Sequence, residues 1–226
     1  MQIMNMTPLR KLAYTPPETP YLDVLYADDD ILICNKQTGL LSVPGRAEEM
    51  KDCLESRLNA QYGEVYTVHR LDMETSGLMV YARSKDAQRQ LNQSFMDRIV
   101  TKHYIADVFG VPQGDAGEIN LPLICDWPNR PRQKVDFDIG KPATTFWSVV
   151  NKSPAHCRVL LKPITGRSHQ LRVHMLELGL PILGDSLYAH DAAYTPYERL
   201  HLHASLLEFP HPVTKKKLQF ESAASF

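Results

Sequence analysis

The segment from His69 to Gly77 places an aspartate and two cations in a short stretch between two apolar runs. It reads HRLDMETSG and joins VYTVH (65–69) to LMVYAR (78–83). Short connections on rigid elements commonly display reactive groups. A carboxylate at Asp72 could act there as a nucleophile or could stabilise positive charge. It could equally hydrogen-bond its own turn, as turn aspartates often do, so this segment alone leaves both interpretations open.

A second segment, LKPITGRSHQLRVH (161–174), gathers cations at the predicted start of a helix. It contains Arg167, His169, Arg172 and His174. A helix N-terminus favours anions, and cations ordinarily lie at the other end. The cluster therefore indicates a negatively charged partner, either a phosphate or a carboxylate from elsewhere in the chain. The alternative is a solvated polar face, which many charge clusters on helices are.

Most of the elements that would position these segments are predicted strands. Apolar and β-rich runs separated by turn residues indicate strands over 22–26, 30–36, 65–69, 78–83, 103–110, 118–124, 134–138, 143–150, 157–164, 200–209 and 217–221. Many of these runs are close neighbours in the sequence, as in hairpins. The pattern therefore predicts an α+β fold built on a mixed, largely antiparallel β-sheet with flanking helices and loops.

Three helices are predicted beside the sheet. Residues 48–61 place Cys53, Leu54 and Leu58 at helical spacing. Ser84 is positioned to cap a helix over 85–98, with an inward stripe of Ala87, Leu91 and Phe95. The third helix begins at or just after Ser168 and ends at Gly179, with a core stripe of Leu171, Met175 and Leu178.

Composition limits the class of protein without choosing a function. The 226 residues carry a net charge of −1, so any polyanion would have to meet a local basic surface. Two segments offer one: residues 158–174, which contain no acid, and a stretch with Arg130, Arg132 and Lys134. Cys34, Cys53, Cys125 and Cys157 are too widely spaced for a zinc knuckle, which favours reduced thiols. No apolar run is long enough for a bilayer, and the absence of a signal-peptide pattern predicts a cytoplasmic protein.

The two reactive segments together identify a family resemblance. HRLDxxTSG followed by GRxHQLRVH resembles the RluA-type pseudouridine synthases, and the resemblance extends through NKQTGLLSVPG, TKHYIADVFG and LHLHA. It covers nearly everything after about residue 21. The stretch DWPNRPRQKVDFDIGKPATT (126–145) resembles the branch of the family that modifies two RNAs. Gln37 departs from the family, which more often has proline there, and this change should affect loop rigidity more than chemistry.

The resemblance implies a role for three residues in catalysis. Asp72 would be the catalytic aspartate, acting at C1′ of the ribose while the N-glycosidic bond of a uridine breaks. The uracil then turns, C5 bonds to C1′, and a base removes the proton from C5. Arg172 would pair with Asp72 and keep it ionised. Tyr104 would stack on the target base, and its phenol would assist proton removal.

The resemblance also implies how RNA is held. Arg70 would occupy the gap left by the flipped uridine, where a guanidinium can stack and contact phosphates. The remaining predicted RNA-contacting or scaffolding residues are His69, Arg167, His169, His174, Arg130, Arg132 and Lys134. The expected substrates are a uridine in a large-subunit rRNA hairpin and one in the tRNA anticodon loop. We expect no cofactor, no metal and no protein partner, and a monomer.

The predicted domain organisation is an extended N-terminal arm (1–20) followed by one catalytic domain (21–226). Twenty residues are too few for the S4-like RNA-binding domain of many relatives, since stable domains need about 40 or more. Three alternatives remain. The enzyme could modify a single rRNA or tRNA uridine, it could bind RNA without turnover, or it could be a metal-dependent hydrolase that uses His169, His174, His201 and His203.

Overall fold

The computed structural model describes residues 13–226, and these residues form two compact units. Unit 1 is Ile105–Leu202, and unit 2 combines Ala13–Tyr104 with His203–Phe226. Strands β5 (Thr101–Phe109) and β11 (Leu202–Pro210) contribute residues to both units. Of the predicted N-terminal arm, residues 13–20 form no helix or strand, and residues 1–12 lie outside the described part.

Unit 2 is built on a sheet whose strands follow the order β1-β2-β4-β11-β5. Its further strands are β1 (Val24–Ala27), β2 (Ile31–Lys36), β3 (Tyr66–Thr67), β4 (Ser76–Ala82) and β12 (Lys217–Glu221). Strand β11 pairs with β4 in parallel, whereas β1 with β2, β2 with β4, and β11 with β12 are antiparallel. The predicted mixed sheet of an α+β fold is therefore confirmed in this unit.

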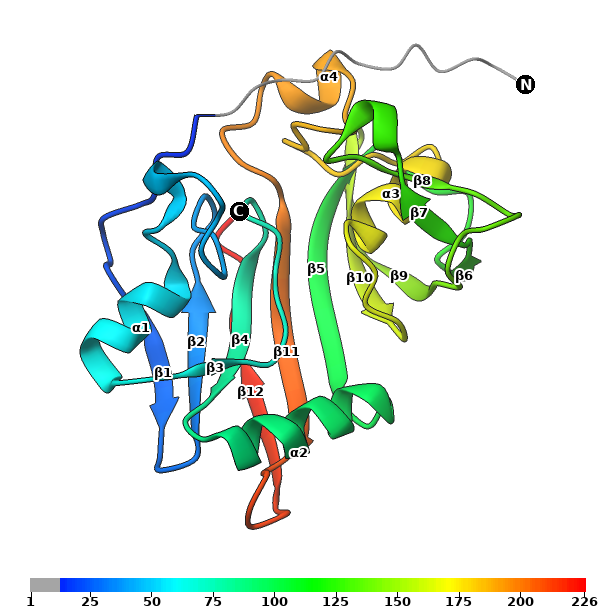
Figure 1. Ribbon diagram of the computed structural model, residues 1–226. Helices are drawn as coiled ribbons and strands as arrows, with labels where there is room; N and C mark the ends of the chain where they lie inside the picture. The colour runs from blue at the N-terminus through cyan, green and yellow to red at the C-terminus, as the bar shows by residue number, and fades with distance from the viewer. Residues whose placement is uncertain (1–12) are drawn as a thin grey trace. The chain divides into compact units, whose positions relative to one another are not determined.

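Two helices cover opposite faces of the β2–β4 pair, because side chains alternate between the faces of a strand. Ile31 and Ile33 pack in a cluster with helix α2 (Lys85–Met96), whereas Leu32 and Cys34 pack with helix α1 (Leu54–Tyr62). Strand β4 is buried throughout, as expected of a strand with a helix on each face. Figure 1 shows α1 and α2 beside this part of the sheet.

The helix predictions for unit 2 are largely confirmed, with one correction. Ser84 caps α2 by accepting a hydrogen bond from Ala87 N (3.1 Å), and its apolar stripe faces the core. The helix predicted over 48–61 is wrong in its first turns. Residues Glu48–Met50 form a separate 3₁₀ turn, η1, and Cys53 caps α1 instead of lying inside it. The Cys53 sulfur accepts from Ser56 N (3.4 Å), which satisfies a donor that the helix leaves open.

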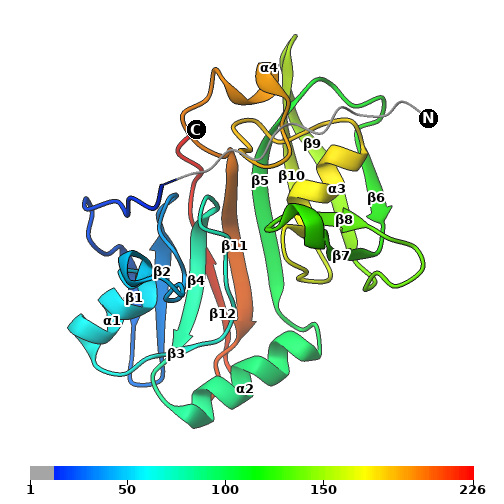
Figure 2. The same cartoon turned by 45° about the horizontal axis from the view of Figure 1, so that its top comes forward.

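Unit 1 contains the sheet order β5-β10-β9-β6 and a separate hairpin, β7–β8. Its elements are β6 (Ala116–Asn120), β7 (Leu123–Cys125), η2 (Trp127–Asn129), β8 (Gln133–Val135), β9 (Thr144–Lys152), β10 (His156–Pro163), α3 (Gln170–Glu177) and α4 (Asp191–Tyr194). Strands β6, β9 and β10 pair antiparallel. Figure 2 shows the β7–β8 hairpin next to α3, with which β8 is in contact.

Three predictions for unit 1 need correction. The strand predicted over 134–138 ends at Val135, because Asp136 Oδ1 accepts from Asp138 N (3.1 Å) and Ile139 N (3.0 Å) and starts a turn. The strand predicted over 118–124 is broken, because Pro122 has no N–H for the ladder, and it forms β6 and part of β7 instead. Leu178 is not a core residue, since it is 39% exposed just after α3. Helix α3 is instead buried from Gln170 to Met175 on all sides, a pattern that belongs to a fully enclosed helix and not to an amphipathic one.

Within residues 13–226, no helix reaches the length and hydrophobicity that a membrane span needs.

Candidate active site

The loop that carries Asp72 runs from the end of β3 to the start of β4, and hydrogen bonds to its main-chain atoms hold it in place. Ser42 Oγ donates to Leu71 O (2.7 Å), and Leu71 N donates back to Ser42 Oγ (3.2 Å). Thr75 N donates to Asp72 O (3.1 Å), which closes the turn behind the aspartate. These bonds fix the peptide units on both sides of the Asp72 side chain.

A buried lysine of the segment that contains Ser42 also anchors this loop. Lys36, only 1% exposed, donates from Nζ to the carbonyl oxygens of Leu40 (2.7 Å), Gln37 (2.8 Å) and Met73 (3.0 Å). Thr38 Oγ1 donates to Glu74 O (2.6 Å). The NKQTGLLS segment (35–42) that follows β2 is therefore the platform on which the Asp72 loop rests.

Strand β11 fixes the downstream end of this loop. Gly77 has φ +112, and a Cβ there would come within 2.4 Å of Ala204 O, so only glycine fits this close parallel contact. Beside it, Ser76 Oγ and His203 Nδ1 are 2.9 Å apart. Because Ser76 and Gly77 lie against β11 in this way, strand β4 begins directly after the Asp72 loop.

Tyr104, at the centre of β5, lies close enough to Asp72 for the two to interact electrostatically. Its ring packs against the buried cluster that includes Leu71. Burial raises the pKa of the Tyr104 phenol, and the negative charge of Asp72 raises it further. The phenol is therefore protonated at neutral pH. Unit 2 thus brings together two of the three predicted catalytic residues.

The cations that precede Asp72 differ in their surroundings. Arg70 is exposed. His69 Nε2 accepts a hydrogen bond from Val80 N (3.1 Å), and its ring stacks on Phe95 with centroids 4.9 Å apart. Burial, with a contribution from the Lys102 charge, lowers the pKa of His69 to about 3. Its imidazole is consequently neutral and packed, which suits scaffolding better than phosphate contact.

In unit 1, Arg172 forms a buried bidentate ion pair with Asp185. Arg172 Nε and Nη2 donate to the two carboxylate oxygens at 2.8 and 2.6 Å, and the side chains are 2% and 0% exposed. Asp185 Oδ1 also accepts from Leu187 N (2.9 Å) and Tyr188 N (3.1 Å). The guanidinium lies 5.4 Å from the centroid of the Tyr188 ring. The predicted pairing of Arg172 with Asp72 links residues of two units and stays a prediction.

Gln170 organises the loop before α3 through four hydrogen bonds. Its Oε1 accepts from Thr165 Oγ1 (2.7 Å) and Arg167 N (3.0 Å), and its Nε2 donates to Thr144 O and Thr145 Oγ1 (both 3.0 Å). His174 lies one turn along the helix, with Nδ1 2.9 Å from Thr145 Oγ1, and burial lowers its pKa. Gln170 and His174 therefore hold the helix against β9.

The two basic segments predicted from the sequence meet in unit 1. His169, in a left-handed conformation at φ +53, has Nδ1 2.7 Å from the Tyr188 hydroxyl, which also accepts from Gln133 N (2.8 Å). Exposed Arg167 donates from Nε to Pro142 O (3.1 Å). We call residues 123–142, which contain the β7–β8 hairpin, the β7–β8 segment. Hydrogen bonds through Tyr188 and Pro142 thus join the loop before α3 to this segment.

The β7–β8 segment also presents aromatic side chains that the sequence reasoning missed. Trp127 is 66% exposed, with the Arg130 guanidinium 4.1 Å from its ring centroid, and Phe137 is 77% exposed. Of the predicted cations, Lys134 is exposed and 3.6 Å from Asp136, whereas Arg132 is only 5% exposed. The missed signal was the alternation of aromatic residues and cations in DWPNRPRQKVDFD, a pattern that suits base stacking beside phosphates.

The histidines of the metal-hydrolase alternative are engaged elsewhere. His201 Nδ1 lies 3.2 Å from Asp107 Oδ2, in an ion-pair cluster that also includes Arg158. His203 Nε2 lies 3.2 Å from Ser222 O, and its Nδ1 faces Ser76. Each of these two rings thus has a protein partner on at least one of the nitrogens that could bind a metal ion.

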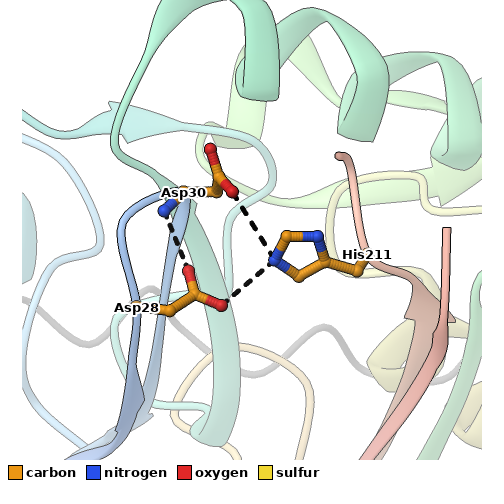
Figure 3. A group of neighbouring side chains, drawn as sticks. All are labelled: Asp28, Asp30 and His211. Carbon is orange, nitrogen blue, oxygen red and sulfur yellow. Dashed lines mark hydrogen bonds and ion pairs between the residues drawn. The ribbon is translucent and has the colours of Figure 1, made fainter. Parts of the chain in front are cut away.

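Among residues 13–226, one group has ligand atoms close enough for a metal ion: Asp28, Asp30 and His211 (Figure 3). Its donor set does not fit that use. His211 Nδ1 accepts from Val213 N (3.2 Å) and Thr214 N (3.1 Å), so the proton of the neutral ring is on Nε2, which points at Asp28 Oδ2 (3.1 Å). Asp28 therefore receives a hydrogen bond from His211, and the group ties the β1–β2 turn to the β11–β12 turn.

Comparison with known proteins places this geometry in a family. A family model described as RNA pseudouridylate synthase matches residues 30–177. The dual-specificity RNA pseudouridine synthase RluA of Escherichia coli strain K12 is 51% identical over 214 residues, which cover 94% of this chain and 98% of that protein. The enzyme of the same name from Haemophilus influenzae is 48% identical over 216 residues, covering 95% and 99%. This chain belongs to the RNA pseudouridylate synthase family.

Solved structures of other family members agree with the fold. Human RNA pseudouridylate synthase domain containing 1 superposes with a TM-score of 0.78 at 28% identity, over 94% of this chain and 87% of that one. Human RNA pseudouridylate synthase domain containing 4 gives 0.72 at 28% identity, over 89% and 88%. This pseudouridine synthase is thus an isomerase acting on RNA, and the fold expected from its motifs is confirmed.

Proposed function

We propose that this enzyme converts uridine to pseudouridine in two RNAs, a large-subunit rRNA hairpin and the tRNA anticodon loop. The observation that carries the proposal is the identity of about half the residues, over nearly the whole of both chains, to enzymes named for dual specificity. A loop sequence and bent shape common to the two RNAs would be the feature read, since RNA-binding proteins recognise loops and splayed bases. Modification of a single uridine by the same chemistry is the second candidate.

In the proposed mechanism, Asp72 supplies the carboxylate that reacts. It attacks or stabilises C1′ of the ribose while the bond from C1′ to N1 of uracil breaks. The uracil turns and stays bound, C5 bonds to C1′, and a base removes the proton from C5 while N1 takes one up. Because the uracil is only re-attached to the same ribose, and the proton lost from C5 is balanced by the proton gained at N1, the reaction consumes no co-substrate, and we expect it to need no cofactor.

Tyr104 and Arg172 support this step in different ways. A neutral phenol is a poor base, so the raised pKa of Tyr104 favours stacking on the uracil and hydrogen bonding over proton abstraction. Arg172 is a fixed positive charge held by Asp185. As the predicted partner of Asp72, it would keep that carboxylate ionised through the reaction.

We assign RNA contact to the exposed cations and aromatic residues. Arg70, next to Asp72 in the chain, is the candidate for the gap left by the flipped uridine. The Trp127–Arg130 pair and Phe137 offer flat surfaces on which unpaired bases can stack. Arg167 and Lys134 would contact phosphates, while His69, His169 and His174 position the loops.

We further propose that residues 21–226 act as one catalytic domain, as a monomer, in the cytoplasm. All four cysteines are free thiols, three of them buried, which suits a reducing compartment. No protein partner is needed by the proposed chemistry, because the RNA alone supplies the atoms that react.

Tritium release from RNA labelled at uridine C5 tests the proposal. Wild type and Asp72→Asn would be assayed on an anticodon stem-loop and an rRNA hairpin, each with and without a chelator. We expect release from both RNAs, insensitive to the chelator. In the variant we expect a loss on the order of 10⁴-fold with RNA binding retained. Release from one RNA supports the single-uridine candidate, and appreciable turnover by Asp72→Asn would exclude Asp72 as the essential carboxylate.

A further inference from the structure

Unit 1 contains a cavity that the proposed chemistry does not use. Its volume is about 500 Å³, and α3, the β7–β8 segment and the Leu187–Tyr188 segment contribute to its lining. Val173, Leu176 and Leu187 give it apolar walls, together with the aromatic ring of Tyr188. Cavities of about 300–1,000 Å³ with apolar walls and a few polar groups are typical of small-ligand sites.

The charged groups that line the cavity are of both signs. Arg132 and Lys134 come from β8 and the turn before it, and Asp126 and Glu177 are the carboxylates. The cations suit a phosphate. A carboxylate accepts hydrogen bonds from exocyclic amino groups, which adenine, cytosine and guanine have and uracil lacks. Apolar walls, a cation and a carboxylate together match a nucleotide whose base carries an amino group.

The cavity also contacts the residues that hold Arg172. Leu187 and Tyr188 line it, and their N–H groups donate to the same Asp185 carboxylate that binds the Arg172 guanidinium. The ring of Tyr188, which lines the cavity, has its centroid 5.4 Å from that guanidinium. A ligand packed on Leu187 and Tyr188 would therefore contact the two residues that help Asp185 to hold Arg172 in position.

We propose that this cavity is a second nucleotide site, which takes an unpaired adenosine, cytidine or guanosine of the substrate RNA while the target uridine reacts elsewhere. The phosphate meets Arg132 and Lys134, and the base packs on Val173 and on Leu187 and Tyr188, the two residues whose N–H groups donate to the Asp185 carboxylate that holds Arg172. The site thus reads one base of the loop and couples that reading to catalysis. The inference rests on the proposed function for the identity of the RNA.

The test fills the cavity and removes bases one at a time. Leu176→Trp places bulk in the cavity, and Leu178→Trp is the matched control, because Leu178 is exposed and does not line it. A series of stem-loops would carry an abasic nucleotide at each unpaired position other than the target uridine. We expect one position at which the abasic change lowers kcat/KM of wild type and of Leu178→Trp roughly tenfold or more. In Leu176→Trp the same change should cost nothing further, because the pocket is already closed.

A second variant covers the case in which Leu176→Trp does not fold. Lys134→Gln should weaken the response at that position, whereas Lys141→Gln, an exposed lysine of the same segment outside the cavity, should not. At that position, replacing adenine by purine, or guanine by hypoxanthine, removes only the amino group and should reproduce most of the loss. Identical abasic profiles in wild type and the folded cavity variants would overturn the proposal.

Binding of single nucleotides separates this inference from the proposed function. Wild type would be titrated with AMP, CMP, GMP and UMP while the Leu187 and Tyr188 amide signals are followed by NMR. Shifts with the amino-bearing nucleotides, weaker with UMP and abolished in Leu176→Trp but not in Leu178→Trp, support the site even if no tritium is released from either RNA. Absence of shifts with all four, or equal shifts in Leu176→Trp, would overturn it even if the enzyme is active.

Discussion

The Asp72 loop of unit 2 and the Arg172 region of unit 1 are fixed by different means. Around Asp72, hydrogen bonds from Ser42, Lys36 and Thr38 end on main-chain oxygens of the neighbouring residues. Arg172 is instead held by its guanidinium group, which donates two hydrogen bonds to the buried carboxylate of Asp185. The hydrogen bonds around Asp72 fix the position of its main chain. The ion pair with Asp185 fixes the position of the Arg172 charge.

This difference matches the work proposed for each residue. A carboxylate that reacts at a sugar carbon has to change its bonding during turnover, and support through the backbone positions the residue without using its carboxylate oxygens. A guanidinium that acts only by its charge gains from a rigid position, because preorganised charges need no reorganisation in the transition state. Removing one support at a time tests whether Asp72 and Arg172 are held in these two different ways.

The largest effect on stability is expected from Asp185→Asn, which leaves the Arg172 charge buried without its counterion. Breaking a buried pair in this way costs about 3–5 kcal/mol, measured as the free energy of unfolding in urea. Asp86→Asn is the matched control, because its pair with Arg89 is 2.6 Å long but exposed, and exposed pairs are worth about 0–1 kcal/mol. Equal losses in the two variants would contradict the view that Asp185 holds Arg172.

Lys36→Met should have a smaller effect on stability but a clear effect on kcat. The methionine fills the space, yet leaves three carbonyl groups without their donor, two in the 35–42 segment and one, Met73 O, in the Asp72 loop, at a cost of about 1–3 kcal/mol. Since one of those carbonyls is next to Asp72, kcat should fall while KM changes little. Lys51→Met removes an exposed lysine bonded to one carbonyl and should do neither. Unchanged kcat in Lys36→Met would show that the loop keeps its position without this anchor.

Arg70→Ala asks whether the exposed residue of the Asp72 loop acts on RNA and not on the fold. Stability should be unchanged. Turnover of a uridine flanked by duplex should fall roughly tenfold, because flipping costs a few kcal/mol and the arginine offsets part of it. A uridine in an already flexible loop should lose much less. Equal losses on both substrates would argue against the gap-filling role.

At neutral pH the smallest effect is expected from the neutral His69 beside the loop, whose contribution appears only as the pH falls. Its folded-state pKa is about 3, whereas an unfolded histidine takes up a proton near about pH 6.5. The unfolded state therefore binds more protons below pH 6.5, and stability is lost as the pH falls from there toward 3, by at most about 1.4 kcal/mol per unit. Urea unfolding at several pH values should show a shallower dependence in His69→Gln. An unchanged slope would mean that His69 is protonated in the fold.

The sequence predicted the elements of unit 2 better than those of unit 1, for a physical reason. Helix α2 is amphipathic and its cap is local, so Ser84 and the Ala87–Leu91 stripe were visible in the sequence. Helix α3 is buried on every side, so the polar residues Gln170, Arg172 and His174 masked its environment. Partners such as Asp185 and Thr145 come from other segments of the chain and have no signal in local spacing.

The candidate site shows the same contrast. Asp72, Tyr104 and Arg172 were indicated by motifs, and the proximity of Asp72 and Tyr104 follows from the fold of unit 2. Lys36 looked like a surface lysine at the end of a strand, and only the structure places its ammonium group among carbonyl oxygens. Trp127 and Phe137 were overlooked because exposed aromatic residues cannot be told from core residues by type alone.

The division of strands between the units has a consequence for how the enzyme matures during synthesis. Unit 1 is one continuous stretch, Ile105–Leu202, whereas unit 2 needs residues from both sides of it. Domains generally fold as units while the chain is being made. The Asp72 loop receives its downstream support from β11, through the contact of Gly77 with Ala204. A nascent chain can therefore complete unit 1 first, and the Asp72 loop gains its downstream support only after β11 has emerged from the ribosome and paired with β4.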